Sequence, residues 1–511
     1  MLDFIDGFLN RITMYRLVLY FLIALLAIAA AFGAFGILPY GPLAIVFSTA
    51  ILLLVSWITN QLFAKTFGAQ PNVESVYITA LILALIITPV MPSADPANMP
   101  GITFLVWAAV WAMACKYILA INKKHLFNPA AFAVALTALT INQSASWWIG
   151  GNLPMLAFVL VGGLLVTRKI RRFDLVASFL AVGLLTIVLT NTASDPLTTL
   201  QKAFLHAPIL FFAFIMLTEP LTTPPTRALR IIYGALVGFL FAPAIHVGSV
   251  YSTPELTLIA GNIFSYLASP KVKYVLKLKQ KEGIGTDMLD FVFANDKPPR
   301  FRPGQYMEWT FAHKKSDSRG NRRYFTIASS PTEADLRLGV KFYDPPSSFK
   351  KNLLAMKPGD LIVGGQLAGD FTLPRDQRKK LVFVAGGIGI TPFRSMIKYL
   401  IDCGERRDVV LLYSNRTVAE IAYREIFDEA EARLGMRTIY TVTDANETLP
   451  DERYYRGRIN AKLIAQAIPD YRERTFYISG THAMTTAFHR TLRTMGVPAR
   501  RIKTDFFPGF A

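Results

Sequence analysis

Long runs of uncharged apolar residues fill the first half of this 511-residue chain and stop near residue 270. Residues 1–270 contain 13 Lys and Arg and 8 Asp and Glu, which leaves 41 and 27 for residues 271–511. Apolar runs of about 20 residues can cross the hydrocarbon core of a bilayer, which is about 30 Å thick. The charge split therefore predicts a polytopic α-helical membrane domain over residues 1–269, fused to a soluble part.

The apolar stretches recur along this half at regular intervals, and loop charges predict their orientation. The stretches are 16–36, 41–63, 76–92, 101–121, 128–142, 152–167, 174–191, 204–217, 231–250 and 255–268. With the N-terminus inside, basic residues such as Arg16, Lys65, Lys123 and Arg168 lie on the inner side, and only Lys202 lies outside. We expect about ten helices in the plasma (inner) membrane, in contact with lipid, with both termini and the soluble part cytoplasmic. The three shorter stretches could instead be buried or broken helices that line a cavity.

Charge and cysteine counts exclude several classes of protein. The net charge is +19, but inner loops and a soluble part facing anionic headgroups account for it, so no nucleic-acid partner is predicted. The only cysteines are Cys115 and Cys403. Two thiols exclude a disulfide framework and an iron–sulfur cluster held by this chain alone, and no metal site is predicted.

Polar residues within or beside the apolar stretches are candidates for function because they are costly in a membrane. Lys116 could snorkel to the interface, and Glu74, Glu219 and Glu255 lie at segment ends, where carboxylates are often without function. Asn128-Pro129 and the Thr218–Pro225 run break helices, which exposes backbone groups to a ligand or an ion.

Together these motifs resemble a specific family. Lys124–Ala130, with its Phe-Asn-Pro-Ala, and Thr218-Glu219-Pro220 are similar to motifs of the D-type membrane protein of the Rnf electron-transport complex and of its B-type relative in the sodium-pumping NADH:quinone oxidoreductase. The resemblance covers about residues 15–268 and implies a transmembrane electron-transfer domain. Those proteins esterify FMN to a Gly-Ala-Thr motif, which this chain lacks, and 131–153 is too short for the segment that carries it. We therefore expect no covalent FMN, while a non-covalent flavin, or no cofactor, stays open.

The soluble half changes its pattern near residue 377. Short strands separated by turn signals are expected at 272–280, 288–293, 305–311, 324–328, 335–343 and 361–364, which favours a small antiparallel barrel over residues 270–376. Strands at 380–385, 408–413, 438–443 and 475–478 then alternate with helices at 392–403, 419–434 and 484–495. This alternation is typical of a doubly wound α/β nucleotide-binding domain over residues 377–511.

Two motifs of the soluble half carry chemistry. The apolar strand Leu381–Ala385 runs into Gly386-Gly387-Ile388-Gly389 and a helix that starts at Thr391-Pro392, so glycines and helix N–H groups could hold a pyrophosphate. The second motif, Arg322–Pro331, joins an arginine for a phosphate to an aromatic ring and a hydroxyl. Each motif alone is also compatible with a turn or a strand that binds nothing.

With Phe301–Tyr306 and Gln366–Pro374, these motifs resemble the ferredoxin–NAD(P)+ reductase family across residues 271–511. The resemblance implies FAD on the barrel and NADH or NADPH on the second domain. It implies a flavin phosphate on Arg323, ring stacking by Phe325, and Thr326 at the flavin N5. It gives catalytic roles to Phe325, Thr326, Thr391 and Ser479, and places cofactor-binding residues at Gly304, Gln305, Tyr306, Arg323, Phe325, Thr326, Ser347, Ser348, Gly386, Gly387, Gly389, Thr391, Pro392, Ser414, Arg416, Gly480 and Met484.

Three positions depart from the family pattern. Phe325 replaces a tyrosine and so loses a phenolic hydrogen bond, Ser479 replaces a cysteine near the hydride path, and a proline replaces the glycine before Ser347. Phe506-Phe507 could stack on the flavin or pack in the core.

The sequence thus predicts a membrane-bound NAD(P)H-dependent FAD oxidoreductase. Its acceptor is a membrane-domain flavin, a quinone or an extracytoplasmic redox protein. Two alternatives stay open. One is a haem-containing reductase that would use His206 or His246, and the other is an ion-translocating protein with a regulatory flavin domain.

Overall fold

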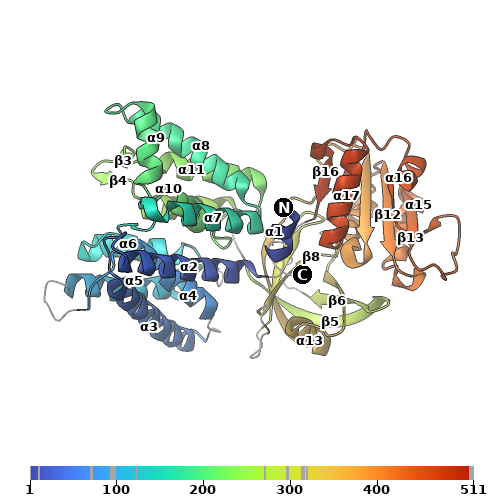
Figure 1. The fold of residues 1–511 in the computed structure, drawn as a ribbon. Coiled ribbons are helices and arrows are strands. Elements are labelled where there is room, and N and C mark those ends of the chain that lie inside the picture. The colour runs from blue at the N-terminus through green and yellow to red at the C-terminus, as the bar shows by residue number, and fades with distance from the viewer. Residues whose placement is uncertain are drawn as a thin grey trace. The chain divides into compact units, whose positions relative to one another are not determined.

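The chain divides into two compact units, Met1–Val272 and Lys273–Ala511, called here the membrane unit and the reductase unit (Figure 1). The computed structural model describes residues 2–9, 12–68, 73–92, 99–121, 124–269, 272–294, 299–311, 317 and 320–505.

The described part of the membrane unit is helical, apart from two short hairpins. Its elements are α1 (Leu2–Leu9), α2 (Met14–Ala34), α3 (Pro42–Thr66), α4 (Val73–Ile86), α5 (Met99–Ile118), β1 (Ala120–Ile121), β2 (Lys124–His125), α6 (Pro129–Ile141), α7 (Leu153–Ile170), α8 (Phe173–Thr190), α9 (Pro196–Leu205), α10 (Ile209–Phe211) with a π-helical turn (Phe212–Met216), α11 (Arg227–Phe241), β3 (His246–Val247), β4 (Val250–Tyr251) and α12 (Pro254–Ala268).

The prediction of about ten spanning helices is not confirmed. Within the described residues, five helices (α2, α3, α5, α7 and α8) are long and apolar enough to cross a bilayer, or six if α9 and Ile209–Met216 form one span bent by 66°. Helices α4, α6, α11 and α12 have 14, 13, 15 and 15 residues. At about 1.5 Å per residue they are shorter than the hydrocarbon core. Prolines occupy the first positions of α6 and α12, where the missing N–H of proline costs no helical hydrogen bond.

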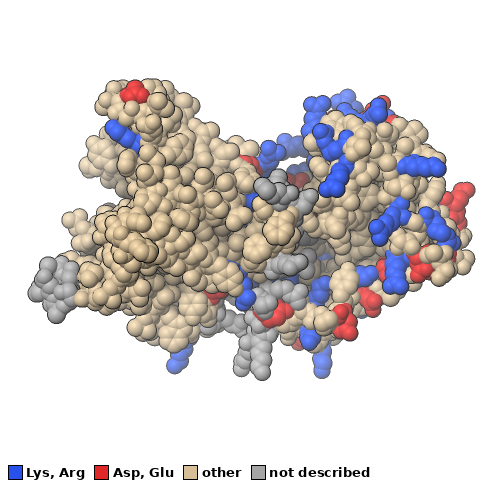
Figure 2. Space-filling view, viewed as in Figure 1, with Lys and Arg blue, Asp and Glu red and all other residues tan. Residues whose placement is uncertain are grey.

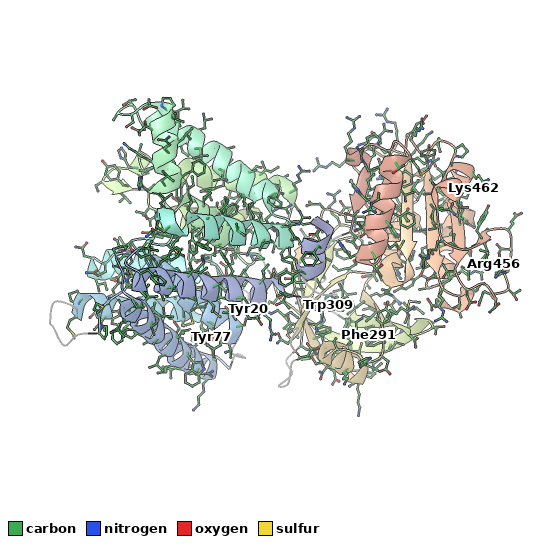
Figure 3. The ribbon with its side chains drawn as sticks, in the orientation of Figure 1. Tyr20, Tyr77, Phe291, Trp309, Arg456 and Lys462 are labelled. Carbon is green, nitrogen blue, oxygen red and sulfur yellow. The ribbon has the colours of Figure 1, made fainter. Side chains whose placement is uncertain are left out.

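The surface of the membrane unit is apolar. Large aliphatic side chains point outward, among them Leu54, Leu62, Leu139, Leu185 and Leu189, and the face in Figure 2 is almost free of charge. Tyr20 of α2 and Tyr77 of α4 also project from their helices (Figure 3). The hydrocarbon core of a bilayer contains no water, so aliphatic side chains gain nothing there by being buried in protein. An aliphatic outer surface therefore fits a surface that faces lipid.

The first part of the reductase unit is a six-stranded antiparallel sheet with strand order β8-β7-β10-β5-β6-β9. Its elements are β5 (Tyr274–Gly285), β6 (Met288–Ala294), β7 (Tyr306–Thr310), β8 (Arg322–Thr326), β9 (Leu336–Lys341), α13 (Ser348–Ala355) and β10 (Leu361–Ala368). Trp309 and Phe291, labelled in Figure 3, are fully buried in its core, and so is Phe293. All six predicted strands are present, so the predicted antiparallel domain is confirmed.

The second part is a parallel six-stranded sheet with order β14-β13-β12-β11-β15-β16. Its elements are β11 (Leu381–Gly386), α14 (Thr391–Asp402), β12 (Val409–Asn415), α15 (Arg424–Leu434), β13 (Arg437–Val442), β14 (Tyr454–Arg456), α16 (Ala461–Ala467), β15 (Thr475–Ser479), α17 (His482–Thr494) and β16 (Ile502–Thr504). The predicted alternation is confirmed. The helix expected from residue 419 begins only at Arg424, because Tyr423 adopts a left-handed conformation with φ of 59°.

Candidate functional site

Glycines form a tight turn between β11 and α14. Gly386 ends β11, Gly387–Ile390 forms one 3-10 turn, and α14 starts at Thr391 with Pro392 in its first turn. Gly387 has a φ of +52°, and a Cβ atom on Gly389 would lie 2.5 Å from the Ser479 carbonyl oxygen. A side chain is thus excluded at Gly389 and strained at Gly387, which leaves room at these two positions for a phosphate to approach the backbone.

A second turn, between β15 and α17, lies directly against the first. A Cβ atom on Gly386 or on Gly480 would collide with the Met484 sulfur. Strands β11 and β15 are parallel neighbours, so both turns leave the same carboxyl edge of the sheet. The structure therefore brings together Gly386, Gly389, Ser479, Gly480 and Met484, at the edge where open α/β sheets bind ligands.

Ser479 is buried, and its hydroxyl donates to the Asp505 carboxylate over 3.1 Å. Asp505 lies 26 positions further along the chain, and no motif in the sequence pointed to it. The predicted residues Phe506-Phe507 lie outside the described residues.

The next strand, β12, carries the residues predicted for the adenosine half of the coenzyme. Ser414 is half-buried and Arg416 is exposed, both at the carboxyl end of β12 beside β11. The Asp444 N–H donates to the Arg416 carbonyl over 2.9 Å, which holds this end against the residues after β13. Arg456, at the end of β14, and Lys462 of α16 project from the outer part of the same domain (Figure 3).

The barrel presents its predicted flavin residues at the start of β7 and the end of β8. Gly304 has a φ of +90°, and a Cβ atom there would collide with the Phe371 carbonyl oxygen. Gln305 accepts from the Arg302 N–H over 2.9 Å and donates to the Gly369 carbonyl over 3.2 Å. Its own carbonyl accepts from the Ile327 N–H over 3.0 Å. Gln305 thus ties three segments of the predicted flavin site together.

The aromatic side chains near the end of β8 lie on opposite faces. Phe325 is buried in the barrel core, with its ring centroid 5.9 Å from that of Phe349. Tyr324 packs on Tyr306 at 5.9 Å on the other face and donates its hydroxyl to Glu308 over 2.7 Å. Thr326, which pairs with Tyr306 across β7 and β8, is buried. Stacking of Phe325 on a flavin stays a prediction.

A carboxylate stands where the resemblance places a flavin phosphate. Ser347 caps α13 by accepting from the Lys350 N–H. The Asp317 carboxylate accepts from the Ser348 N–H over 2.9 Å and lies 3.5 Å from the Arg323 guanidinium, which is itself fully buried. Arg323 and the start of α13 therefore already hold an anion, which is the arrangement that a phosphate requires. Sequence reasoning did not identify Asp317.

The two cofactor-binding parts meet at Thr391. The Thr391 hydroxyl donates to the Ile388 carbonyl over 3.2 Å. Its methyl group lies against β9 of the barrel, where a Cβ atom on Gly339 would be 2.8 Å from it. The residue predicted to face the nicotinamide thus lies at the junction with the flavin-binding part.

Two predicted motifs of the membrane unit also come together. The Asn128 amide donates to the Glu219 carboxylate over 2.9 Å, and the Asn128 oxygen caps the first two N–H groups of α6 at 3.1 Å each. His125 Nε2 lies 3.6 Å from the Glu219 carboxylate, and the Thr222 hydroxyl donates to the same carboxylate over 3.2 Å. The Asn262 oxygen accepts from the Asn128 N–H over 2.8 Å. We call these residues the Glu219 cluster.

A small pocket adjoins the Glu219 cluster. Its lining combines polar and apolar side chains: Ile121, His125, Leu126, Leu221, Thr222, Asn262, Ser265 and Tyr266. The Ser265 hydroxyl is buried and has no hydrogen-bond partner among the residues that the structure describes. Broken backbone and polar side chains are features by which membrane proteins line a binding cavity.

Other membrane candidates have hydrogen-bond partners or positions of their own. The Lys116 ammonium group of α5 donates to the Ser75 carbonyl over 3.0 Å and to the Thr79 hydroxyl over 2.9 Å, so it ties α5 to α4. Glu255 is buried and accepts from the Trp147 indole over 3.0 Å. His206 follows the end of α9, and His246 lies exposed on the β3–β4 hairpin. Among the described residues, no three His, Cys, Asp or Glu side chains are grouped to hold a metal.

Comparisons with known protein families match both halves of the chain. The model of the NQR2, RnfD, RnfE family matches residues 148–269, and that of the oxidoreductase NAD-binding domain matches residues 383–490. Both predicted resemblances are therefore confirmed, and so is the two-part architecture of a polytopic helical unit and a ferredoxin-reductase-like FAD/NAD domain. The apolar helices and the first family together indicate a multi-pass membrane protein.

Similar proteins match the reductase half. A flavohemoprotein of Bacillus subtilis is 24% identical over 237 residues, 46% of this chain and 58% of that protein. A glycine betaine monooxygenase reductase subunit of Pseudomonas aeruginosa is 26% identical over 226 residues, 43% of this chain and 60% of that protein. The chain thus spans little more than half the length of these relatives. The FAD/NAD-binding domain of a nitric oxide dioxygenase from Vibrio cholerae aligns with a TM-score of 0.41 and 20% identity, over 46% of this chain and 98% of that one.

Proposed function

We propose that this chain is a membrane-bound NAD(P)H-dependent flavin oxidoreductase that passes electrons from NAD(P)H, through FAD, to an acceptor in or beyond its membrane unit. The observation that carries the proposal is the meeting of the two glycine turns, at the carboxyl edge of the parallel sheet, with Thr391 against the barrel. This arrangement would place a nicotinamide beside a flavin. We assign FAD to residues 270–376 and the coenzyme to residues 377–511.

The residues present fit FAD. Arg323 and the N-terminus of α13, at Ser347 and Ser348, would hold its phosphates in place of the Asp317 carboxylate. Gly304, Gln305 and Tyr306 would border its ring system with Phe325 and Thr326. When bound, FAD supplies the ability to accept two electrons as a hydride and to release them one at a time.

The remaining site residues would position the coenzyme. Gly386, Gly387 and Gly389, followed by Pro392, would admit its pyrophosphate to the N-terminus of α14. Thr391, Ser479, Gly480 and Met484 would border the nicotinamide, and the Asp505 carboxylate fixes the Ser479 hydroxyl. Ser414 and Arg416 would contact the adenosine half, where the exposed guanidinium suits an anionic group of either NADH or NADPH.

The acceptor belongs to the membrane side of the protein. The hydrogen-bonded polar side chains of the Glu219 cluster support a polar site within the membrane unit, beside which a non-covalent flavin or a quinone would bind. An extracytoplasmic redox protein requires such an internal cofactor, because a bilayer of about 30 Å is too thick for one direct transfer. The inner-side basic loops support a plasma-membrane location with the reductase unit in the cytoplasm.

The test is to purify the full chain in mild detergent and to identify its flavins after acid release. We expect FAD at about one per chain, since one barrel offers one site. A second, acid-released flavin would locate a cofactor in the membrane unit. Absence of FAD from a folded preparation, even after incubation with FAD, would refute the proposed function.

A further inference from the structure

Arg394 lies on α14, one helical turn after Thr391, and is 4% exposed. Its guanidinium donates to the Ala328 carbonyl over 3.1 Å and forms a two-pronged ion pair with Glu333, in which Nη2 and Oε1 are 2.9 Å apart. Ala328 and Glu333 belong to the barrel, whereas Arg394 belongs to the α/β part. The side chain therefore joins the two cofactor-binding parts of the reductase unit.

Neighbouring hydrogen bonds reinforce this junction. The Ser395 hydroxyl donates to the Ser329 carbonyl over 2.7 Å, and both groups are buried. The Ser330 N–H donates to the Glu333 carboxylate over 2.6 Å, which fixes the acid that receives Arg394. Ala328 and Ser329, which follow β8, thus accept hydrogen bonds from Arg394 and Ser395 of α14.

The guanidinium is also confined from a third side. It lies over the Tyr423 ring, with 5.5 Å between its central carbon and the ring centroid. The Tyr423 hydroxyl reaches β9, where a Cβ atom on Gly339 would lie 2.6 Å from it. A lysine could keep the charge, but it could not stack its flat head on the ring and fork to the carboxylate at once.

These contacts connect the two residues expected to touch the reacting groups. Ala328 lies two positions after Thr326, which is predicted beside the flavin N5. Arg394 lies three positions after Thr391, which is predicted beside the nicotinamide. A shift of α14 against β8 would change the gap between the two rings directly.

We propose that Arg394 is a positioning residue that sets the distance between flavin and nicotinamide during hydride transfer. This inference rests on the proposed function. It assigns to Arg394 no contact with either cofactor, so its effect should fall on the transfer step and not on binding. A misplacement of about 1 Å can slow such a step about 100-fold.

The test compares flavin reduction in single turnovers by the full-length, FAD-loaded parent and its Arg394→Lys variant. We expect the maximal reduction rate of the variant to fall about 10- to 100-fold. The coenzyme concentration for half-maximal rate should change by less than about threefold, because uniform binding is untouched. With coenzyme deuterated at the transferred position, the isotope effect should be at least as large as in the parent.

Arg474→Lys is the matched control. Arg474 is also buried and forks to a carboxylate, with 2.7 and 2.9 Å to Asp408. Arg474 also donates a hydrogen bond to Asp470, and this bond is the largest contribution that lowers the pKa of Asp470 to about 2. Asp408 and Arg474 precede β12 and β15, so this pair lies at the amino edge of the sheet, away from the glycine turns. The flavin of the Arg474→Lys variant should be reduced within about twofold of the parental rate, since Arg474 orients neither cofactor.

The outcomes separate the two claims. A parent that binds FAD but is not reduced by NADH or NADPH would refute the proposed function. A competent parent with an Arg394→Lys variant that is reduced at the parental rate would overturn only the positioning role. If Arg394→Lys fails to retain FAD, the Ser395→Ala variant is measured in its place, because it removes one hydrogen bond of the same junction. A slower maximal rate at unchanged half-saturation supports the role, and a parental rate rejects it.

Discussion

The Asp317 carboxylate places a negative charge of the protein itself at the position proposed for the FAD phosphates. Its carboxylate is held by the start of α13 and by Arg323, the groups proposed to take the FAD phosphates. An anion that must leave before a ligand binds competes with that ligand, because both draw on the same hydrogen bonds and positive charge. Under the proposed assignment, the affinity of this chain for FAD would therefore depend partly on Asp317.

Replacing Asp317 with Asn should tighten FAD binding, by about tenfold if about 1.4 kcal/mol of competing interaction is removed. Flavin fluorescence quenching on titration of the deflavinated full chain measures the change. Asp335→Asn is the control, since Asp335 pairs with Lys279 on the barrel surface over 2.8 Å. Unchanged or weaker FAD binding by Asp317→Asn would contradict the phosphate assignment.

Gly389 offers a second test at this scale. Its Cβ position lies 2.5 Å from the Ser479 carbonyl oxygen, which is backbone and cannot easily move. Gly389→Ala should separate the two turns and weaken NAD(P)H binding about tenfold or more, with FAD content unchanged. Steady-state KM reports the loss, and Gly283→Ala, at a position with open space around it, is the control. A parental KM in Gly389→Ala would show that the turn does not hold the coenzyme.

Single residues show what the sequence could and could not predict. Gly386, Gly389, Gly480 and Met484 were identifiable because backbone turns of fixed geometry demand particular residues at fixed spacing. Asp317, Asp505 and Arg394 were not, because each acts on a partner far along the chain or outside any motif. Only the folded structure brings such pairs within hydrogen-bond distance.

At the scale of elements, glycines allow close approach of helices α8 and α11. Cβ atoms on Gly234 and Gly238 would collide with the backbone of α8, at 2.7 Å from the Leu175 oxygen and 2.5 Å from the Phe179 oxygen. Four-residue spacing puts both glycines on one face of α11, the small-residue pattern by which membrane helices pack. The packing of these two helices thus depends on the absence of side chains.

Gly238→Leu should force α8 and α11 apart. The free energy of unfolding of the membrane unit should fall by about 1–3 kcal/mol, as in overpacked cores. The detergent-solubilised variant should lose its folded fraction at lower temperature than the parent in size-exclusion thermostability assays. Ala228→Leu, on the exposed side of the same helix, should behave like the parent. Equal stability of both variants would show that the helices do not depend on this contact.

Elements also show why about ten spanning helices were predicted, of which only five or six meet the length and apolarity of a span among the described residues. Apolar composition marks burial, and a short buried helix is as apolar as a spanning one. Helices α6 and α12 begin at Pro129 and Pro254 and have only 13 and 15 residues, and the segment formed by α9 and Ile209–Met216 is bent by 66°. Strands β14 and β16 were missed because three residues give no periodicity.

For the whole molecule, the proposed orientation can be tested on the native chain, since its two cysteines differ in exposure. Cys115 is buried and Cys403, directly after α14, is exposed. A membrane-impermeant maleimide should label Cys403 in inverted vesicles and not in intact spheroplasts, because the reductase unit is proposed to be cytoplasmic. The Cys403→Ser variant should remain unlabelled in both. Labelling from outside would place the reductase unit on the other face.

The central claim is that NAD(P)H reduces a flavin held by this chain. Anaerobic titration of the purified, full-length, FAD-loaded protein with NADH, and separately with NADPH, tests it most directly. The account predicts that the visible absorbance of the oxidised flavin bleaches with about one equivalent of at least one coenzyme, since a hydride carries both electrons. A folded, FAD-loaded chain whose flavin stays oxidised in excess NADH and NADPH would contradict the account.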